Sequence, residues 1–565
     1  MSEKIENKNA AQRKTYVGQV FDKGENLVKR ETLNSMKKEW KKLHEEGDIH
    51  IHDLDAYNYT YNCLTFNILD KFPYESLKKY DDRRKISSLF EHYKNMISKV
   101  GNEQSGGMGF GNFDIDTAKI LKNLDVNFNI ENEELLRDRI WDFIVWCNNS
   151  HERMGQVSYY VTLNVGLAND ELSRKICEMV IDEFGKQTIA IHKPNIVFKI
   201  KNGINKNEKD VNRYLLDKAL ECTSRKMIPT YLLCDCKLNK NKDPAGLSIM
   251  GCRTRVVDDI FGESGSRGRG NIGNITINLP RLAFRVMESY IHENIDEKMM
   301  KVKQEWVKIA EEVVKILLDR YEKIINVDKE YFSTVKKYSL WIKDMETESL
   351  NDVFKHGTLS IGFIGLCEMI EILFGHKYYE NKDTYNEAQN FVKFMREYTD
   401  NCIKKYNYNF SLLATSGELI SGRFPQKDKK KFNHNVLGRD HYTNSFHVNV
   451  DSNLSAIEKV SMEGPFHEFC NGGSITYIEI EGAPLGNNEG LEEVIDHANV
   501  CGVHYLGFNF PIDCCTVCEK EGIFDSCPEC GSKKIKRIRR VSGYLEELEY
   551  FVSGKKDEVK YRGSN

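Results

Sequence analysis

The sequence lacks any long hydrophobic run. None of its 565 residues falls in a stretch that approaches the roughly 20 apolar residues of a membrane-spanning helix. The polar and charged segment 1–14 also lacks the apolar core of a secretory signal peptide. We therefore expect a cytoplasmic protein that has no membrane as a partner.

The chain also lacks a strong net charge and a dense set of cysteines. Its formal net charge of -4 gives no overall reason to expect nucleic acid or an acidic membrane surface as a partner. Its 16 cysteines are too dilute for a secreted disulfide scaffold, which favours reduced thiols. With 40% hydrophobic and 29% charged residues, the composition is that of an ordinary folded chain rather than a disordered one.

No internal repeat or low-complexity linker divides the first 500 or so residues. Ranges 134–147 and 171–184 have the periodicity of helices, whereas 159–165 and 196–200 are rich in β-forming residues. Apolar residues at helical spacing predict further helices over 30–46, ending at Gly47, and over 303–325. The alternation favours an α/β fold.

Near the C-terminus, four cysteines have the spacing of a zinc ribbon. Cys515 and Cys518 form one Cys-x-x-Cys knuckle, and after eight residues Cys527 and Cys530 form a second. Two such knuckles bring four soft thiolate ligands to the corners of a tetrahedron. The spacing predicts a structural zinc site, although iron could also occupy four thiolates.

Other candidate residues are weaker when each is taken alone. Cys252 lies beside a glycine in a predicted loop, where a thiol is accessible to a reaction partner. Cys63 lies in a predicted strand, where a lone cysteine is usually a small core residue. His50 and His52 face the same way in a short extended segment, and a structural role is favoured over a metal site. The glycine cluster at 105–111 is expected to be a mobile loop, since no Gly-Lys-Ser/Thr closes it as in a phosphate-binding loop.

Several motifs occur in one order along the chain. They are Gly47-Asp-Ile-His-Ile-His-Asp53, Met250-Gly-Cys-Arg253, Arg269-Gly-Asn-Ile-Gly273, Thr276-Ile-Asn-Leu-Pro-Arg281, Tyr442-Thr-Asn-Ser-Phe-His-Val448, the two cysteine knuckles, and Arg540-Val-Ser-Gly-Tyr-Leu545. In this order they resemble the anaerobic, class III ribonucleotide reductases, which are glycyl radical enzymes. The resemblance runs from about residue 15 to residue 550.

The resemblance implies a fold and a domain organisation. It implies a ten-stranded α/β barrel of two half-barrels, with a central finger loop that carries Cys252 at its tip. A C-terminal zinc ribbon and glycyl radical loop would bring Gly543 towards that tip. We therefore expect residues 1–510 to form the catalytic barrel and 511–565 the zinc ribbon and radical domain. Because the barrel motifs begin before residue 50, we expect no N-terminal ATP-binding regulatory domain.

The resemblance also implies an activity, the reduction of ribonucleoside triphosphates to 2'-deoxyribonucleoside triphosphates. A separate radical-SAM activating enzyme with a 4Fe-4S cluster would place the radical on Gly543, since a glycine without Cβ can flatten at Cα. Cys252 would become a thiyl radical that removes the ribose 3'-hydrogen, and Cys63 would act on the opposite sugar face. Asn271 matches the asparagine that holds formate, the expected reductant. Nucleotide effectors and a homodimer are implied by the family.

Thr443, Asn444 and Ser445 offer small hydroxyl and amide groups that could bind substrate phosphate or ribose, and a satisfied turn is an equally open reading.

Two alternative functions remain. A pyruvate formate-lyase-type enzyme would use adjacent cysteines, and Cys514 and Cys515 are adjacent, but the first knuckle needs Cys515. A nucleic-acid-binding ribbon would use the basic run 533–540, which is short and without interleaved aromatics, so we expect no direct nucleic-acid partner.

Overall fold

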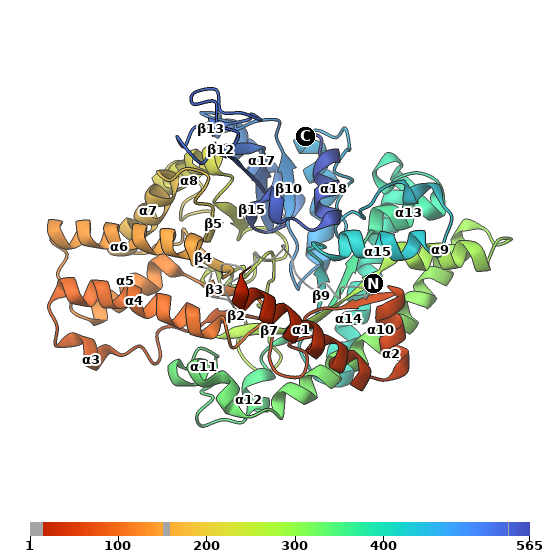
Figure 1. Ribbon diagram of the computed structural model, residues 1–565, viewed down its shortest axis with the longest axis horizontal. Coiled ribbons are helices and arrows are strands. Elements are labelled where there is room, and N and C mark those ends of the chain that lie inside the picture. The colour runs from red at the N-terminus through yellow and green to blue at the C-terminus, as the bar shows by residue number, and fades with distance from the viewer. Residues whose placement is uncertain (1–14, 151–158, 541, 565) are drawn as a thin grey trace.

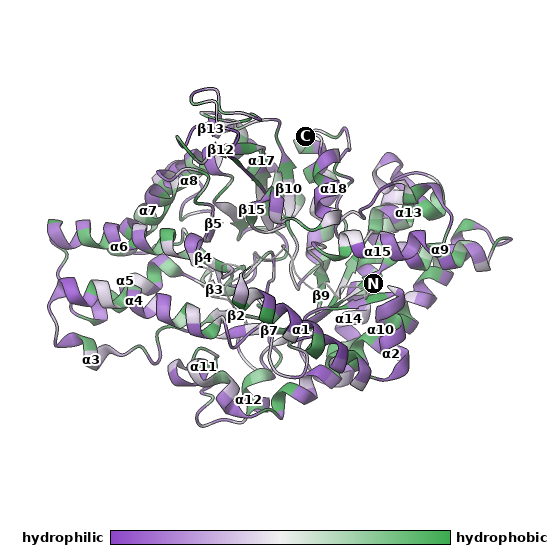
Figure 2. Cartoon of the chain, in the orientation of Figure 1, coloured by the Kyte–Doolittle hydropathy of each residue, from purple (hydrophilic) through white to green (hydrophobic). Residues whose placement is uncertain are grey.

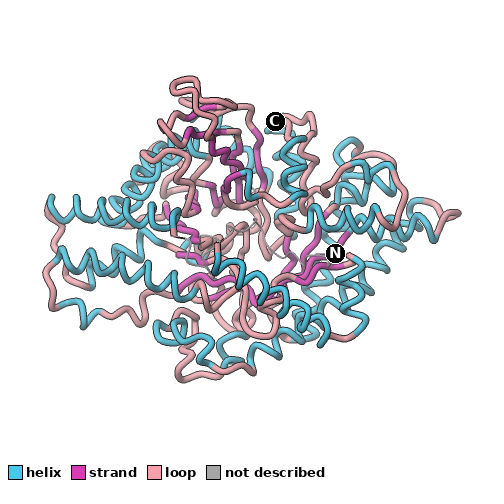
Figure 3. The backbone as a smooth tube through the Cα atoms, in the orientation of Figure 1, coloured by secondary structure: helices cyan, strands magenta, loops and turns pink. Residues whose placement is uncertain are grey.

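The computed structural model describes residues 15–150, 159–540 and 542–564 (Figure 1). The polar first 14 residues and Val541 of the Arg540-to-Leu545 motif lie outside these ranges. An 11-stranded sheet forms the centre of the fold, and helices surround it (Figures 1 and 3). None of the described helices is long and apolar enough to span a bilayer.

The first half of the sheet consists of five parallel strands. They follow one another in chain order and in space: β2 (Cys63–Phe66), β3 (Met108–Phe110), β4 (Val161–Val165), β5 (Asn195–Ile200) and β6 (Thr230–Leu233). Every residue in these strands is buried, as expected for parallel strands covered on both faces. Helices connect the strands, which gives the βα alternation that the sequence predicts.

The second half is built in the same way and runs antiparallel to the first. It contains β7 (Arg269–Asn278), β8 (Thr358–Ile364), β9 (Phe410–Ala414), β10 (Thr476–Glu479) and β11 (Tyr505–Asn509). Neighbours pair in parallel along β7-β8-β9 and along β10-β11, and an isolated parallel bridge from Leu413 to Gly473 connects the two groups. Antiparallel β2-β7 and β6-β11 pairs join the halves, and β1 (Ile49–Ile51) adds to β7. The predicted ten-stranded barrel of two half-barrels is confirmed.

Amphipathic helices cover the outside of the barrel. Figure 2 shows polar and apolar residues alternating along outer helices such as α4 and α6, the pattern of helices with one face on a core. Around the first half lie α3 (Tyr74–Lys78), α4 (Asp82–Val100), α5 (Phe113–Asn123), α6 (Ile130–Asn149), α7 (Glu171–Gly185) and α8 (Arg213–Lys226). The later helices are α9 (Leu279–Ser289), α10 (Ile295–Ile325), α11 (Ser333–Tyr338), α12 (Leu350–Phe354), α13 (Leu366–Phe374), α14 (Lys382–Tyr406), α15 (Ile420–Lys429), α16 (Ala456–Glu463) and α17 (Asn488–Cys501).

Two local predictions are wrong. The helix predicted over 30–46 is two helices, α1 (Tyr16–Ser35) and α2 (Lys38–Glu46), because Met36 takes an extended conformation with ψ 162. Leu33, Met36 and Trp40 are nevertheless all buried, so the apolar periodicity continues across the break and conceals it. The glycine cluster predicted as a mobile loop contains β3, and its Gly107 packs directly against the finger loop.

The finger loop runs from η1 (Pro244–Gly246) to β7 and enters the barrel. Met250 and Thr254 exchange two backbone hydrogen bonds of 3.1 and 3.2 Å, which closes a tight turn around Cys252. Asn164 on β4 donates its side-chain amide to the carbonyl of Ile249 at 2.9 Å and accepts from the Ile249 amide at 2.9 Å. A barrel strand thereby holds the base of the turn.

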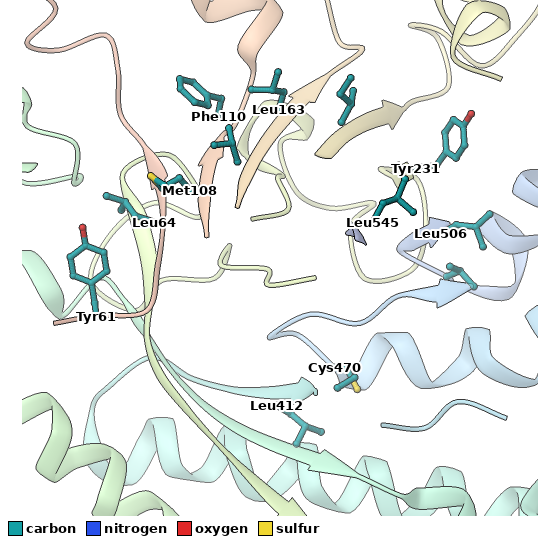
Figure 4. Close-up of a cluster of buried hydrophobic side chains, with 14 of the residues drawn as sticks. Tyr61, Leu64, Met108, Phe110, Leu163, Tyr231, Leu412, Cys470, Leu506 and Leu545 are labelled. Carbon is teal, nitrogen blue, oxygen red and sulfur yellow. The ribbon is translucent and has the colours of Figure 1, made fainter. Parts of the chain in front are cut away.

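The C-terminal segment forms a small second sheet. Its strands are β12 (Ile512–Cys515), β13 (Glu521–Gly522), β14 (Ile535–Arg540) and β15 (Leu545–Glu547), in the order β13-β12-β14-β15, and α18 (Ser553–Tyr561) follows. Leu545 belongs to the main apolar core, together with residues of both half-barrels that Figure 4 labels, such as Leu163 and Leu412. The core therefore extends to the segment that follows Gly543.

Candidate active site

Gly543 lies against the backbone of Cys252. A Cβ atom added to Gly543 would lie 1.7 Å from the carbonyl oxygen of Cys252 and 2.2 Å from its Cα. Such distances are impossible for any residue with a side chain, so this contact requires glycine. Two predicted site residues that are far apart in the sequence therefore touch in the fold.

The Cys252 thiol has an acidic partner that the sequence motifs do not reveal. Its Sγ donates to Oε1 of Glu418 at 3.2 Å, and Oε2 of Glu418 accepts from the Ser416 hydroxyl at 3.0 Å. Burial raises the pKa of the Cys252 thiol, and the neighbouring Glu418 carboxylate raises it further. The thiol therefore keeps its hydrogen at neutral pH. A single glutamate in a loop before α15 carries no motif that could have identified it.

Cys63 lies beside the finger-loop turn. Its Sγ donates to Oδ1 of Asn62 at 2.7 Å and accepts from the Gly107 amide at 3.1 Å. A Cβ atom on Gly251, next to Cys252, would lie 3.9 Å from the Cys63 sulfur. The second predicted cysteine is therefore adjacent to the tip of the finger loop.

Asn271 is the direct cross-strand partner of Cys63, because β2 and β7 pair antiparallel. Its side-chain Nδ2 donates to the hydroxyls of Ser360 at 2.7 Å and Thr358 at 3.0 Å. Its Oδ1 is buried and has no hydrogen-bond partner among the described residues. A buried polar atom without a partner costs free energy, so this amide is suited to a small polar ligand.

The Thr443 to Ser445 segment packs against the start of α13. The Thr443 amide and hydroxyl both donate to Glu368 at 2.8 and 2.6 Å, as in a satisfied turn. In contrast, Oδ1 of Asn444 and Oγ of Ser445 are buried without a partner in the described ranges. Ser445 has a positive φ of 44°, a conformation that is uncommon outside glycine.

A small cavity of about 30 Å³ lies between this segment and the loop around Gly543. Its walls include Thr443, Asn444, Arg540 and Ser542. Other lining residues carry charges of both signs: Lys459, Glu479, Glu558 and Arg562. The cavity offers donors and acceptors beside Ser542, the residue before Gly543.

The four predicted metal ligands come together. The sulfur atoms of Cys515, Cys518, Cys527 and Cys530 all lie within 4.8 Å of one another, with Cys515–Cys530 and Cys518–Cys527 separations of 3.6 and 3.4 Å. Tetrahedral zinc with Zn–S bonds of about 2.3 Å needs sulfur separations of about 3.8 Å, so the cluster fits zinc. It is the only such group in the part of the chain that the structure describes, and neither His50 nor His52 belongs to it.

Two features bear on the alternative functions. Cys514, the neighbour of Cys515, is buried with its sulfur 3.7 Å from the Cys515 carbonyl and stands outside the four-thiol cluster. In the basic run, Lys536, Arg537 and Arg539 form ion pairs with carboxylates at 2.9, 2.7 and 2.9 Å. Three of the six basic residues in this run are therefore paired with carboxylates of the protein, and Arg540 is buried rather than displayed for a nucleic acid.

Comparisons with known proteins identify the family of this chain. The sequence model of the family "anaerobic ribonucleoside-triphosphate reductase" matches residues 6–564. The enzyme of that name from Escherichia coli K12 is 28% identical over 569 residues, which cover 92% of this chain and 77% of that protein. The one from Enterobacteria phage T4 is 27% identical over 573 residues, which cover 92% of this chain and 90% of the phage protein.

Solved structures share the fold. An anaerobic ribonucleotide reductase superposes with a TM-score of 0.74 at 16% identity, over 98% of this chain and 90% of the other. The Thermotoga maritima enzyme in complex with dATP and CTP gives 0.72 at 16% identity, over 97% and 92%. A glycyl radical enzyme from Archaeoglobus fulgidus gives 0.56 at 10% identity, over 97% and 85%. The chain therefore belongs to the anaerobic ribonucleoside-triphosphate reductases, class III ribonucleotide reductases of the glycyl radical family.

Proposed function

We propose that this chain reduces ribonucleoside triphosphates to 2'-deoxyribonucleoside triphosphates with a radical stored on Gly543 and formate as the reductant. The observation that carries the proposal is the contact between Gly543 and Cys252, whose backbones are too close for any side chain at position 543. This contact places the glycine Cα next to the residue that carries the thiol.

The first step is a hydrogen-atom transfer. The Gly543 Cα radical takes the hydrogen of the Cys252 thiol, so that one S–H bond breaks, one C–H bond forms and no charge moves. Cys252 must carry its hydrogen for this step, and its burial beside Glu418 keeps the thiol protonated. The hydrogen bond to Glu418 also orients the S–H group.

The thiyl radical on Cys252 then removes the 3'-hydrogen of the ribose, and the 2'-hydroxyl leaves as water. Cys63, beside the finger-loop turn, supplies a hydrogen to the sugar. Formate held near Asn271 is oxidised to carbon dioxide and provides the two electrons. In sum, ribonucleotide, formate and one proton give deoxyribonucleotide, carbon dioxide and water. The pairing of Cys63 with Asn271 across β2 and β7 supports this arrangement.

Formate and the buried Oδ1 of Asn271 are both hydrogen-bond acceptors, so they cannot bond to each other in the present orientation of the amide. A rotation of the amide by 180° would turn its NH₂ group towards the formate and let the Ser360 hydroxyl donate to Oδ1. With that one rotation the amide can donate a hydrogen bond to formate.

Three supporting roles belong to the same proposal. Cys515, Cys518, Cys527 and Cys530 hold a structural zinc ion that fixes the loops on either side of β13. Thr443, Asn444 and Ser445 bind the phosphate or ribose of the substrate, a role supported by the buried polar atoms of Asn444 and Ser445 that lack partners. A radical-SAM activating enzyme with a 4Fe-4S cluster generates the Gly543 radical.

The nucleotides of a related enzyme guide the remaining assignments. The Thermotoga maritima enzyme has been solved with dATP and CTP, and with dATP bound in its specificity site. We extend to this chain both a triphosphate substrate and nucleotide effectors, acting in a cytoplasmic homodimer.

The test is anaerobic activation with an activating enzyme and S-adenosylmethionine, followed by electron paramagnetic resonance (EPR). We expect a doublet signal in the wild type that is lost in Gly543→Ala, and absence of any signal under competent activation would refute the radical function. Incubation of the activated protein with CTP and labelled formate should then yield labelled carbon dioxide together with dCTP. Formation of dCTP without labelled carbon dioxide would refute formate but leave the reductase in place.

A further inference from the structure

Both carbonyl groups that flank the Cα of Gly543 accept hydrogen bonds from buried side chains. The Tyr477 hydroxyl donates to the carbonyl oxygen of Ser542, which precedes Gly543. Nη1 of Arg540 donates to the carbonyl oxygen of Gly543 itself at 3.4 Å. The two peptide groups on either side of the reacting carbon therefore each have a fixed donor.

These two peptide groups are the groups over which a glycyl radical spreads its unpaired electron. Delocalisation requires the p orbital on Cα to align with the π systems of both peptides, so both peptide planes must be coplanar with Cα. A glycine can take this flat geometry because it lacks Cβ, but it is equally free to take many others. Something outside the glycine must therefore hold the two planes.

Tyr477 and Arg540 are themselves held rigidly. Tyr477 is on barrel strand β10, and its ring lies 5.8 Å from the Arg540 guanidinium. Arg540 is 1% exposed, its Nε donates to Oδ1 of Asn509 at 2.6 Å, and its Nη2 donates to the carbonyl of Met227. A donor whose other hydrogen bonds go to fixed acceptors cannot follow the loop if the loop moves.

The protonation states suit donation. Burial raises the pKa of Tyr477, so its hydroxyl keeps its proton. Arg540 has five N–H donors and keeps its charge at any accessible pH. The Glu479 carboxylate also interacts with Arg540, and the donation from its charged guanidinium increases electron withdrawal by the Gly543 carbonyl.

The finger loop contacts Tyr477 and Ser542. Nη2 of Arg253, the residue after Cys252, donates to the Ser542 hydroxyl at 2.7 Å, and its guanidinium lies 6.0 Å from the Tyr477 ring. Tyr477 therefore contacts both the loop that stores the radical and the loop that receives it.

We propose that Tyr477 and Arg540 are positioning residues that hold the Gly543 peptide groups coplanar and thereby set how widely the radical is delocalised. The inference rests on the proposed radical function. It assigns these residues no contact with the substrate. Loss of either donor lets the loop twist, concentrates spin on Cα and makes the stored radical less stable.

The test compares Tyr477→Phe with Tyr231→Phe after anaerobic activation. Each variant removes one hydroxyl from a buried tyrosine on an adjacent region of the barrel, but the Tyr231 hydroxyl bonds to Thr223 at 2.8 Å, not to the radical loop. In Tyr477→Phe we expect a larger splitting of the EPR doublet by the Cα hydrogen, because more spin remains on Cα. We also expect faster radical decay and a kcat about tenfold lower, which corresponds to about 1.4 kcal/mol, with KM unchanged within about twofold. Tyr231→Phe should match the wild type.

Arg540→Lys provides a second, independent loss of a donor, because lysine keeps the charge but not the fork geometry. It should change the splitting in the same direction, so misfolding of one variant leaves the other to decide. A lower radical yield with unaltered splitting and lifetime would indicate a merely structural role and would overturn the inference. A wild-type protein without a doublet would instead refute the proposed function itself.

Discussion

The C-terminal helix α18 docks onto α15 through two glycines, and replacing one of them should release it. A Cβ atom on Gly554 would lie 2.5 Å from both Cα and N of Gly422 and 3.2 Å from the carbonyl carbon of Ser421. All three are backbone atoms, so no side chain can rotate away. Gly554→Ala therefore forces α18 outwards by roughly 1 Å to reach an ordinary contact distance.

The size of the effect follows from the cost of overpacking. An extra methyl group in a closely packed contact costs about 1–3 kcal/mol, which lowers the ratio of docked to undocked helix by about 5-fold to 150-fold. The helix is coupled to the radical loop, since Arg562 beyond its end donates to the Arg540 carbonyl at 2.9 Å. Undocking should therefore loosen the segment that carries Gly543.

Hydrogen exchange measured by mass spectrometry tests this reasoning. Amides of 553–563 should exchange faster in Gly554→Ala by the same factor, while the helices of the barrel keep their rates. After activation, oxygen should cleave the chain at Gly543 faster than in the wild type, because the radical is less enclosed. Gly482→Ala is the matched control, since a Cβ atom there meets nothing within 4 Å. Equal exchange in the two variants would show that the glycine contact does not hold the helix.

Three further predictions concern other parts of the site. Cys518→Ser should lower the zinc content, measured by metal analysis, from about one ion per chain. It should also reduce the radical yield measured by EPR. A full radical yield without metal would contradict a scaffolding role for the ribbon. Asn271→Ala should raise the KM for formate at least about tenfold with little change in the KM for CTP, and an equal rise in both would indicate general damage to the site. Burial alone would raise the pKa of Glu558, but Lys555 and Arg562 lower it to about 2 from a usual value of 4.5. Its stabilisation is therefore present above about pH 4.5 and lost as pH falls towards 2. Between pH 5 and pH 3, urea unfolding should show about 2 kcal/mol less loss of unfolding free energy in Glu558→Gln than in the wild type, and equal losses in the two proteins would refute the ion pair's contribution.

The sequence predicted features that depend on nearby residues or on a recognisable order of motifs. The spacing of Cys515, Cys518, Cys527 and Cys530 indicated the metal cluster, because two short knuckles largely determine where their own sulfur atoms can lie. The order of motifs indicated the family and therefore the barrel. Helical periodicity identified α6, α7 and α10, but it did not detect the break at Met36, since buried apolar residues continue through it.

What the sequence determined by itself was therefore the α/β class, the four-thiol site and the residues that could take part in radical chemistry. The tertiary structure alone decided which groups surround them. Glu418 reaches Cys252, and Tyr477 reaches Ser542, across 166 and 65 positions of the chain. Such contacts leave no periodicity or spacing in the sequence, because they depend on how the strands and loops of two half-barrels close around a common centre. The requirement for glycine at position 543 likewise comes from the Cys252 backbone that packs against it.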